Sequence, residues 1–204
     1  MQKRADTLWD VAVIGGGPAG MMAAGRAAEN GAKVVLIEKN ETLGKKLLIT
    51  GGGRCNVTNA ELDTRKLLAK FKNSDKFLFS AFSQWSVKET LDFFHTRNMP
   101  TRIEAEQRVF PATQKAQSVW NTLVEYMGTG RVIIRSNAHV VRLISSGTQL
   151  TAIELATGER ITANSYIIAT GGKSHPETGS TGEGFIWLSE LGHSVSEPTP
   201  VLVP

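Results

Sequence analysis

Short apolar runs and a helical stretch alternate near the start of the chain, in the order typical of an α/β fold. Val11–Ile14 and Val34–Ile37 are continuous apolar runs, as in strands that are buried on both faces of a parallel sheet. Met21–Asn30 lies between them, is rich in alanine and methionine, and is followed by Gly31, a typical C-terminal stop. Strand, helix and strand in this order predict a parallel βαβ unit over residues 10–39.

The middle of the chain is predicted to be helical. Apolar residues recur at helical spacing in Leu62–Phe71, Lys76–Phe82 and Val87–Asn98, and Pro100 ends the last of these segments. We expect the aromatic side chains of this region to belong to the core rather than to line a substrate cage. These side chains are Phe77, Phe79, Phe82 and Trp85.

Two further elements are expected before residue 130. A short strand pair is predicted on either side of Glu106 and Gln107. Thr113 is placed to cap a helix over Gln114–Met127, and Gly128 is placed to end that helix.

Several short strands are predicted from residue 131 onward. Turns are expected at Ser145–Thr148 and at Thr157-Gly158, which divide the region into antiparallel strands. An apolar strand, "YIIATGG", then covers residues 166–172. The pattern fits either a three-stranded meander that leads into a further strand or a plain hairpin followed by a loop.

Composition and charge narrow the class of protein. The chain has 204 residues, of which 41% are hydrophobic and 21% charged, as in ordinary globular proteins of one large or two small domains. The net charge of +4 is scattered, so we expect neither a nucleic-acid partner nor a membrane partner. A single cysteine and the lack of a leader-like apolar segment at the start fit a cytoplasmic protein. The histidines are too dispersed for a metal motif, and no metal site is expected. They are His95, His139, His175 and His193.

The turn after the first strand predicts a dinucleotide site. Gly15, Gly17 and Gly20 form G-x-G-x-x-G: the first makes a tight turn, the second admits a pyrophosphate, and the third lets the helix approach the strand. Pro18 and Ala19 open the helix, whose N-terminus favours anions. Glu38 ends the second strand, 18 residues after Gly20, where its carboxylate can accept both ribose hydroxyls and would repel the 2′-phosphate of NADP. Lys39 is assigned to the same site. The alternative is a glycine-rich turn in an unrelated α/β fold.

The strand at residues 166–172 indicates which dinucleotide is bound. Its end, Ala169, Thr170, Gly171 and Gly172, resembles the Ala-Thr-Gly signature of two-dinucleotide-binding-domain flavoproteins of the glutathione-reductase type. The resemblance implies that this segment passes near FAD, that the preceding strands are the three-stranded β-meander of that class, and that the backbone near Val140 contacts adenine.

A closer resemblance covers essentially the whole chain. Its motifs are Lys45–Leu47, Thr50–Asn56, Thr58-Asn59, "RVFPAT" at 108–113, "TGGKSHPETGSTGEGF" at 170–185 and the closing "LGHSVSEPTPVLVP". Together they resemble bacterial FAD-dependent oxidoreductases that include enzymes similar to aminoacetone oxidase and flavoproteins of the bile-acid-inducible type. The resemblance implies an α/β, Rossmann-like FAD-binding domain of glutathione-reductase type with a helical insertion. The implied chemistry is hydride transfer through flavin N5 to or from a small organic substrate, with NAD(P)H as a candidate electron donor.

The glycine-rich segment is predicted to approach the cofactor. In this class it runs under the pyrophosphate toward the flavin ring. Thr50 and Gly51–Gly53 would leave bare backbone N–H groups near the diphosphate or the flavin edge. Arg54 or Lys46 could neutralise a phosphate or hold the flavin O2 region, and Arg54 could instead form an ion pair within the loop. Asn56 could hydrogen-bond the ring or pin the loop.

Two residues are weighed as reactive groups. Cys55 has no second cysteine, which excludes a dithiol mechanism within the chain, so we expect a small packed side chain beside the cofactor; a thiolate that modulates the flavin is the alternative. His175 is either a base near the flavin or a hydrogen-bonded loop residue, at a position the resembled family more often fills with tyrosine. Glu183 and Phe185 stand where Asp and Tyr are expected, which puts the family's substrates in doubt for this chain, but not its cofactor.

Four segments follow from these predictions. Residues 1–60 and 131–190 are assigned to the FAD-binding domain, 61–130 to the insertion, and 191–204 to the start of a substrate domain. We expect the chain to be an N-terminal or truncated portion that lacks the rest of that domain. The alternatives are a catalytically silent FAD- or nucleotide-binding fragment, or a tRNA-modifying flavoprotein with a similar glycine-rich start.

Overall fold

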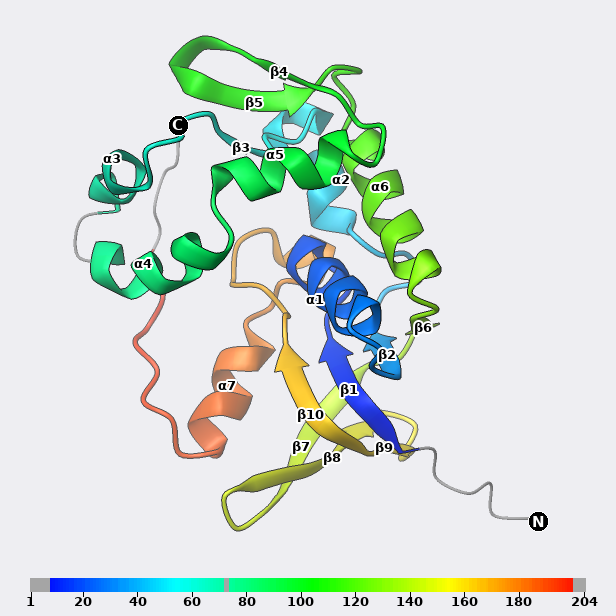
Figure 1. Ribbon diagram of the computed structural model, residues 1–204. Coiled ribbons are helices and arrows are strands. Elements are labelled where there is room, and N and C mark those ends of the chain that lie inside the picture. The colour runs from blue at the N-terminus through cyan, green and yellow to red at the C-terminus, as the bar shows by residue number, and fades with distance from the viewer. Residues whose placement is uncertain (1–7, 72–73, 200–204) are drawn as a thin grey trace. The chain divides into compact units, whose positions relative to one another are not determined.

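The computed structural model describes residues 8–71 and 74–199 (Figure 1). The chain divides into two compact units, of which the first comprises residues 1–46 and 123–204 and the second residues 47–122. The finer division into four segments stays a prediction.

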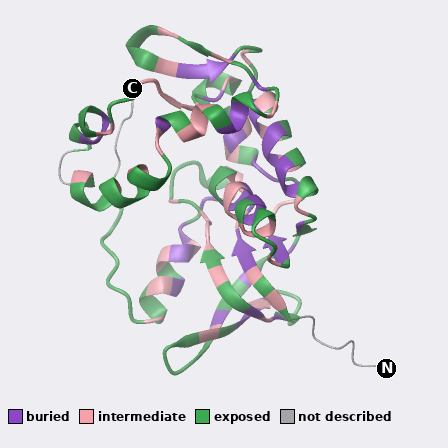
Figure 2. Cartoon of the chain, viewed as in Figure 1, coloured by how far each residue is buried: buried purple, intermediate pink, exposed green. Residues whose placement is uncertain are grey.

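A parallel four-stranded sheet forms the centre of the first unit, in the order β10-β1-β2-β6. The two central strands, β1 and β2, contain continuous apolar runs that are buried, whereas the outer strands β6 and β10 are largely exposed or half-buried. Within the sheet, the buried residues accordingly concentrate in β1 and β2 (Figure 2). The strands are β1 (Trp9–Ile14), β2 (Val34–Ile37), β6 (Ile133–Arg135) and β10 (Ala163–Ile168). Together with α1 (Pro18–Glu29), β1 and β2 confirm the predicted βαβ unit.

Helix α1 packs closely because it is built from small residues. A side chain at Gly25 would lie 2.4 Å from the Tyr126 ring, so the ring can rest on the helix only where no Cβ is present. The Tyr126 hydroxyl also donates a hydrogen bond of 2.9 Å to Glu29 at the end of α1. Gly31 follows with φ of +88°, as expected for a residue that stops a helix.

The predicted meander is present as β7 (Val140–Ser146), β8 (Gln149–Leu155) and β9 (Arg160–Ile161). The three strands are antiparallel, with turns where the sequence predicts them. Alternate residues of β1 and β2 share one apolar cluster with this meander, Ala12 and Ile14 among them. Trp187 of α7 (Glu183–Glu190) joins the same cluster.

The second unit combines short helices with a small antiparallel sheet in the order β3-β5-β4. Ser86 and Glu89 form a capping box at the start of α5, and α5 buries Phe93 and Phe94 in edge-to-face contact. The strand pair β4 and β5 confirms the predicted hairpin. The elements of the second unit are β3 (Thr58–Asn59), α3 (Thr64–Ala69), α4 (Asp75–Gln84), α5 (Val87–His95), β4 (Thr101–Ile103) and β5 (Arg108–Pro111).

Two helices cross the division between the units, α2 (Lys45–Gly53) and α6 (Ala116–Thr129). The boundaries predicted for α6 are wrong. Gln114 has φ of +58° and cannot be helical, and the hydroxyl of Thr113 pairs with that of Ser118. The helix therefore starts later and passes through Gly128.

The prediction that the aromatic residues of α4 belong to the core is also wrong. Phe77 is 85% exposed and Phe79 is 50% exposed, and no residue of α4 is buried. Figure 2 shows this helix mostly in the colour of exposed residues, with the remainder intermediate. Helical periodicity identified the helix, but it could not show whether another element covers its apolar face.

Candidate functional site

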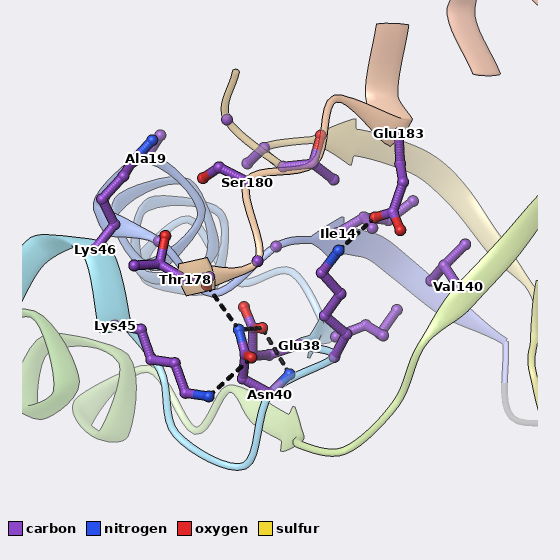
Figure 3. Close-up of a pocket in the computed structure, with 18 of the residues that line it drawn as sticks. Ile14, Ala19, Glu38, Asn40, Lys45, Lys46, Val140, Thr178, Ser180 and Glu183 are labelled. Atoms are coloured by element: carbon purple, nitrogen blue, oxygen red, sulfur yellow. Dashed lines mark hydrogen bonds and ion pairs between the residues drawn. The ribbon is translucent and has the colours of Figure 1, made fainter. Parts of the chain in front are cut away.

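A pocket of about 500 Å³ lies at the carboxyl ends of β1, β2 and β10, within the first unit (Figure 3). Ligands bind at this edge in open parallel sheets, and the volume is in the range of small-molecule sites. Most predicted cofactor residues of this unit come together here. Those that line the pocket are Gly15, Gly17, Pro18, Ala19, Glu38, Lys39, Lys46, Val140, Ala169, Thr170 and Gly171.

The three motif glycines differ in their surroundings. Gly15 has φ of +105°, and a Cβ there would lie 2.5 Å from the carbonyl oxygen of Ala169. A Cβ on Gly20 would lie 1.8 Å from the carbonyl oxygen of Gly15, so α1 can meet the strand end only through a glycine. A Cβ on Gly17 would meet no atom within 4 Å. Gly17 therefore leaves its backbone open to a ligand, whereas Gly20 lies beneath the pocket and shapes it.

The start of α1 provides a site for negative charge. Pro18 is the first helical residue, and Gly17 precedes it without a side-chain cap. An α-helix leaves the N–H groups of its first turn without partners inside the helix, and its N-terminus carries partial positive charge. Because Gly17, Pro18 and Ala19 line the pocket, these groups are available to an anionic ligand.

Glu38 is only 8% exposed, and both oxygens of its carboxylate accept hydrogen bonds. The backbone N–H of Gly16 donates to Oε2 at 2.7 Å. The backbone N–H and the side-chain amide of Asn40 donate to Oε1 at 2.8 and 2.7 Å. A carboxylate has about four acceptor positions. Glu38 therefore retains about one, on Oε2, for a ligand hydroxyl, where the sequence had suggested room for two.

Three lysines line the pocket, and they differ in the partners of their ammonium groups. The Lys39 ammonium forms an ion pair with Glu183 at 2.8 Å and donates to the Thr181 hydroxyl at 3.1 Å. Lys45 donates to the side-chain oxygen of Asn40 at 3.0 Å. The ammonium of Lys46, a half-buried residue, makes no hydrogen bond or ion pair with any residue in 8–71 and 74–199. Of the three ammonium groups, that of Lys46 is the one left for a ligand anion.

Glu183 joins two elements at the edge of the pocket. Its carboxylate contacts Lys39 and, at 3.1 Å, Nε2 of His139. Burial alone would raise the pKa of the Glu183 carboxyl, but the hydrogen bonds from Lys39 and His139 hold that pKa below its ordinary value of 4.5. Glu183 is therefore an ionised group that holds the start of α7 against the ends of β2 and β7.

The end of β10 forms another wall of the pocket. The backbone N–H of Ala169 donates to Ile14 at 2.8 Å, which keeps this segment beside β1, and Gly171 turns with φ of +75°. Gly172 follows and does not line the pocket. His175, farther along, is also outside the lining, and its Nδ1 lies 2.8 Å from Oε1 of Glu177. That contact fits the interpretation of His175 as a hydrogen-bonded loop residue.

The sequence of the chain also matches a known protein family. Residues 9–200 match the family described as HI0933-like protein Rossmann domain. The chain belongs to this family.

Individual relatives and solved structures agree with that assignment. The chain is 33% identical over 196 residues to a 3-dehydro-bile acid delta(4,6)-reductase of Clostridium scindens, covering 95% of this chain and 46% of the relative. It is 29% identical over 196 residues to a ribosomal RNA dihydrouridine synthase of Escherichia coli, covering 96% and 48%. The fold is similar to that of a 3-ketosteroid-delta4-(5alpha)-dehydrogenase from Rhodococcus jostii, with a TM-score of 0.72, 16% identity, and coverage of 94% of this chain and 55% of that one.

Two facts follow from the comparisons. The α/β, Rossmann-like FAD-binding fold that the resemblance implied is confirmed. The chain spans about half the length of the relatives it matches.

The family's glycine-rich segment lies in the second unit. Gly51, Gly52 and Gly53 have φ of +55°, +65° and +82°, a left-handed run that side chains would strain. The Thr50 hydroxyl donates to the carbonyl of Leu47 at 2.7 Å, just before this run. The sequence therefore keeps bare backbone here for a conformational reason, and its cofactor contact stays a prediction.

Arg54 is engaged within the second unit. Its guanidinium forms an ion pair with Glu104 at 3.0 Å, donates to Gln114 at 2.8 Å, and stacks on Phe110 at 4.1 Å from the ring centroid. The ion-pair partner, Glu104, lies outside the glycine-rich loop, so the pair is not the loop-internal one that the sequence suggested, and a cofactor contact of Arg54 stays a prediction. The contacts of Arg54 also hold Gln114 in the conformation that delays the start of α6.

Cys55 and Asn56 both stabilise the loop. Cys55 is 4% exposed, and its backbone N–H donates to Thr50 at 3.0 Å. Burial raises the pKa of the Cys55 thiol above its ordinary value of 9.0, and a hydrogen bond with Thr50 offsets only part of that effect. In the amide orientation that satisfies its neighbours, Asn56 donates to the carbonyls of Val109 and Thr58 at 3.1 and 2.9 Å. Cys55 is thus a packed thiol with a raised pKa, and its expected position beside the cofactor stays a prediction.

Several lining residues were not identified from the sequence. Asn40 lies two positions after Glu38, the residue predicted to bind the ribose, and no known motif places a functional residue at that spacing. His139 directly precedes Val140, and Thr178–Ser180 lie in the family motif but were not assigned to the site. The motif's glycine spacing, T-G-S-T-G, was the available signal for this last group.

The described parts of the chain lack two further kinds of feature, a membrane-spanning helix and a metal-binding cluster. No helix there combines the length and apolar character needed to cross a bilayer. Within the same residues, no group of three or more His, Cys, Asp or Glu side chains is arranged to hold a metal ion.

Proposed function

We propose that the pocket binds the adenosine diphosphate part of FAD, and that the chain supplies the FAD-binding half of a flavin-dependent oxidoreductase. The observation that carries this proposal is one pocket that joins an open Gly17, the free start of α1 and the fixed carboxylate of Glu38. A diphosphate fits the first two and a ribose hydroxyl fits the third. When bound, FAD supplies hydride exchange at its N5 atom.

Individual residues have distinct proposed roles. The Lys46 ammonium neutralises a phosphate, Glu38 accepts a hydrogen bond from the ribose, and Val140 lies at the adenine end. Gly51–Gly53 present backbone N–H groups to the flavin edge or the diphosphate. Glu38 would also repel a 2′-phosphate, which favours FAD over NADP at this pocket.

We further propose a small organic substrate with a conjugated carbonyl group, and NAD(P)H as the electron donor. The bile-acid reductase relative, 33% identical over 95% of this chain, supports this class. The net reaction takes a hydride from NAD(P)H and a proton from water and adds both across the carbon–carbon double bond. Its products are NAD(P)⁺ and the saturated ketone.

Anaerobic absorbance spectroscopy tests this proposal. The chain is loaded with FAD, treated with NADH or NADPH, and then mixed with a conjugated ketosteroid. We expect the nicotinamide to bleach the visible flavin absorbance and the ketone to restore it. Stoichiometric FAD without bleaching by either nicotinamide would instead support the alternative of a silent binding module. Failure to retain FAD at all would contradict the proposal.

A second candidate function is the reduction of an RNA base, and the surface of α3 and α4 favours it. Phe77 and Phe79 are exposed on α4. Four exposed cations lie on or directly after α3 and on α4, and their side chains make no hydrogen bond or ion pair with any described residue. They are Arg65, Lys66, Lys70 and Lys76. Aromatic faces beside unpaired cations bind unpaired nucleic acid by stacking and charge. The ribosomal RNA dihydrouridine synthase relative supports the same candidate.

Fluorescence anisotropy with a short unpaired RNA separates the two candidates. RNA reduction predicts salt-dependent binding that the double substitution Phe77→Ala and Phe79→Ala weakens at least about tenfold, because each stacked base contributes about 1–3 kcal/mol. Ile103→Ala is the control, since Ile103 is 59% exposed on β4 and lacks an aromatic face. Absence of binding at low salt would exclude the RNA candidate.

A further inference from the structure

Both the nitrogen and the oxygen of the Asn40 side-chain amide form hydrogen bonds at the edge of the pocket. Its Nδ2 donates to Oε1 of Glu38 at 2.7 Å and to the carbonyl of Thr178 at 3.1 Å. Its Oδ1 accepts from Lys45 at 3.0 Å. Figure 3 shows Asn40 between Glu38, Thr178 and Lys45, with each of these contacts drawn. An amide nitrogen has two protons, so both are committed.

Asn40 also supplies most of the hydrogen bonds that orient Glu38. Two of the three donors to this carboxylate come from Asn40, and both reach Oε1. The third is the N–H of Gly16, on Oε2. Oε1 is thereby filled, and the open acceptor position is confined to Oε2. The direction in which Glu38 presents that position depends on Asn40.

The loop after β10 is shaped to fit Asn40. Gly179 has φ of +103°, and a Cβ there would lie 2.9 Å from Nδ2 of Asn40 and 3.2 Å from Cε of Lys39. A side chain at this position would push the loop away. The neighbouring Thr178 carbonyl could then no longer accept its hydrogen bond. The close approach of Gly179 and the bond to Thr178 are two separate signs that the loop closes on Asn40.

We infer that Asn40 is the positioning residue for ribose recognition: its amide fixes the Glu38 carboxylate and ties it to the Thr178–Gly179 wall of the pocket. The inference rests on the proposed binding of an adenine nucleotide. Asn40 acts through Glu38 and touches no reacting atom. A purely structural Asn40 would anchor the loop without affecting which nucleotide the pocket prefers.

Nucleotide discrimination distinguishes these roles. Calorimetric titration of the chain compares ADP with 2′-deoxy-ADP and 3′-deoxy-ADP, each of which lacks one ribose hydroxyl. A hydrogen bond to a charged acceptor contributes about 1.5–3 kcal/mol, so we expect the wild-type chain to prefer ADP at least about tenfold over one of the two analogues. The single free position on Oε2 predicts a smaller loss, within about threefold, for the other analogue.

Two substitutions then test Asn40. N40A removes the amide, and N40D keeps its shape but replaces the donating nitrogen with an oxygen. We expect both to reduce the tenfold preference to within about twofold. The control is N30A, because Asn30 makes a comparable local bond, from Nδ2 to the Arg26 carbonyl at 2.8 Å, at the far end of α1. N30A should keep the preference.

The outcomes separate the inference from the proposed function. If N40D keeps the wild-type preference and only its melting temperature falls, Asn40 is structural and the inference is overturned; N40D decides this even where N40A fails to fold. If the wild-type chain binds ADP with no preference over either analogue, the ribose role of Glu38 fails first. If the wild-type chain does not bind ADP, the proposed function fails, and the inference fails with it.

Discussion

The carbonyl oxygen of Gly15 occupies the space where a side chain of Gly20 would begin, 1.8 Å from that Cβ position. The turn and the helix are therefore in contact through bare backbone, and this contact aims the start of α1 at the pocket. Gly17, between them in sequence, has open space where its Cβ would lie. One motif thus contains two glycines that the fold requires and one that a ligand would require.

Substitution of these glycines should separate folding from binding. Gly20→Ala forces Cβ against a backbone atom and is expected to destabilise the first unit by more than about 4 kcal/mol. Gly17→Ala should change the free energy of unfolding by no more than about 1 kcal/mol but weaken ADP binding at least about tenfold, since the new methyl group enters the diphosphate site. Urea unfolding and calorimetric titration measure the two effects. An equal loss of stability in both variants would contradict this assignment.

Lys46 is expected to contribute directly to the affinity for the diphosphate. Lys46→Ala should weaken ADP binding about tenfold at low salt and less at high salt, because the lost contact is a charge-assisted hydrogen bond that ions screen. Lys33→Ala is the matched control: Lys33 lies over the Trp9 ring, 5.1 Å from its centroid, and is not part of the pocket lining. An equal loss in both variants would mean that only net charge matters.

The Glu183 contacts predict a defined pH dependence of stability. The pKa of Glu183 is lowered in the folded chain, so its stabilising effect is present above the ordinary value of 4.5 and is lost as the pH falls through the folded value. The melting temperature of the wild-type chain should exceed that of Glu183→Gln above about pH 5, and the difference should shrink at lower pH. A difference that stays constant down to the acid transition would show that ionisation of Glu183 is irrelevant.

Cys55 should react slowly as long as the chain is folded. Burial raises the pKa of the thiol, so less thiolate is present near pH 8 than in a free cysteine, and the sulfur is shielded as well. We expect iodoacetamide to label the folded chain at least about tenfold more slowly than the chain in urea. Rapid labelling of the folded chain at neutral pH would point to an activated thiolate and reopen the case for a redox role.

Local signals in the sequence were sufficient for the dinucleotide fold. The spacing of Gly15, Gly17, Gly20 and Glu38 between two apolar runs predicted the βαβ unit, because each glycine answers a backbone requirement that is expressed within a few residues. The turns of the meander and the strand at residues 166–172 were found for the same reason.

Contacts between distant segments could not be predicted in this way. Asn40 and Thr178 are 138 positions apart. Their hydrogen bond depends on how the segment after β10, a strand that pairs with β1, reaches the end of β2. The roles of Lys39, Lys45 and Lys46 were equally hidden, since Glu183 and Asn40 decide which ammonium remains available. The burial of the α4 aromatics was predicted wrongly. The spacing of apolar residues within a helix can be read from neighbouring positions, but whether another element packs over that apolar face depends on residues far away in the sequence.

The central claim is that one pocket binds the adenosine diphosphate part of FAD, and competition tests it most directly. FAD binding to the chain can be followed by flavin fluorescence while ADP is added. The account predicts that ADP displaces FAD competitively in the wild-type chain. It also predicts that Gly17→Ala weakens the binding of both at least about tenfold while melting at nearly the wild-type temperature. FAD binding that is unaffected by saturating ADP, or that survives Gly17→Ala unchanged, would contradict it.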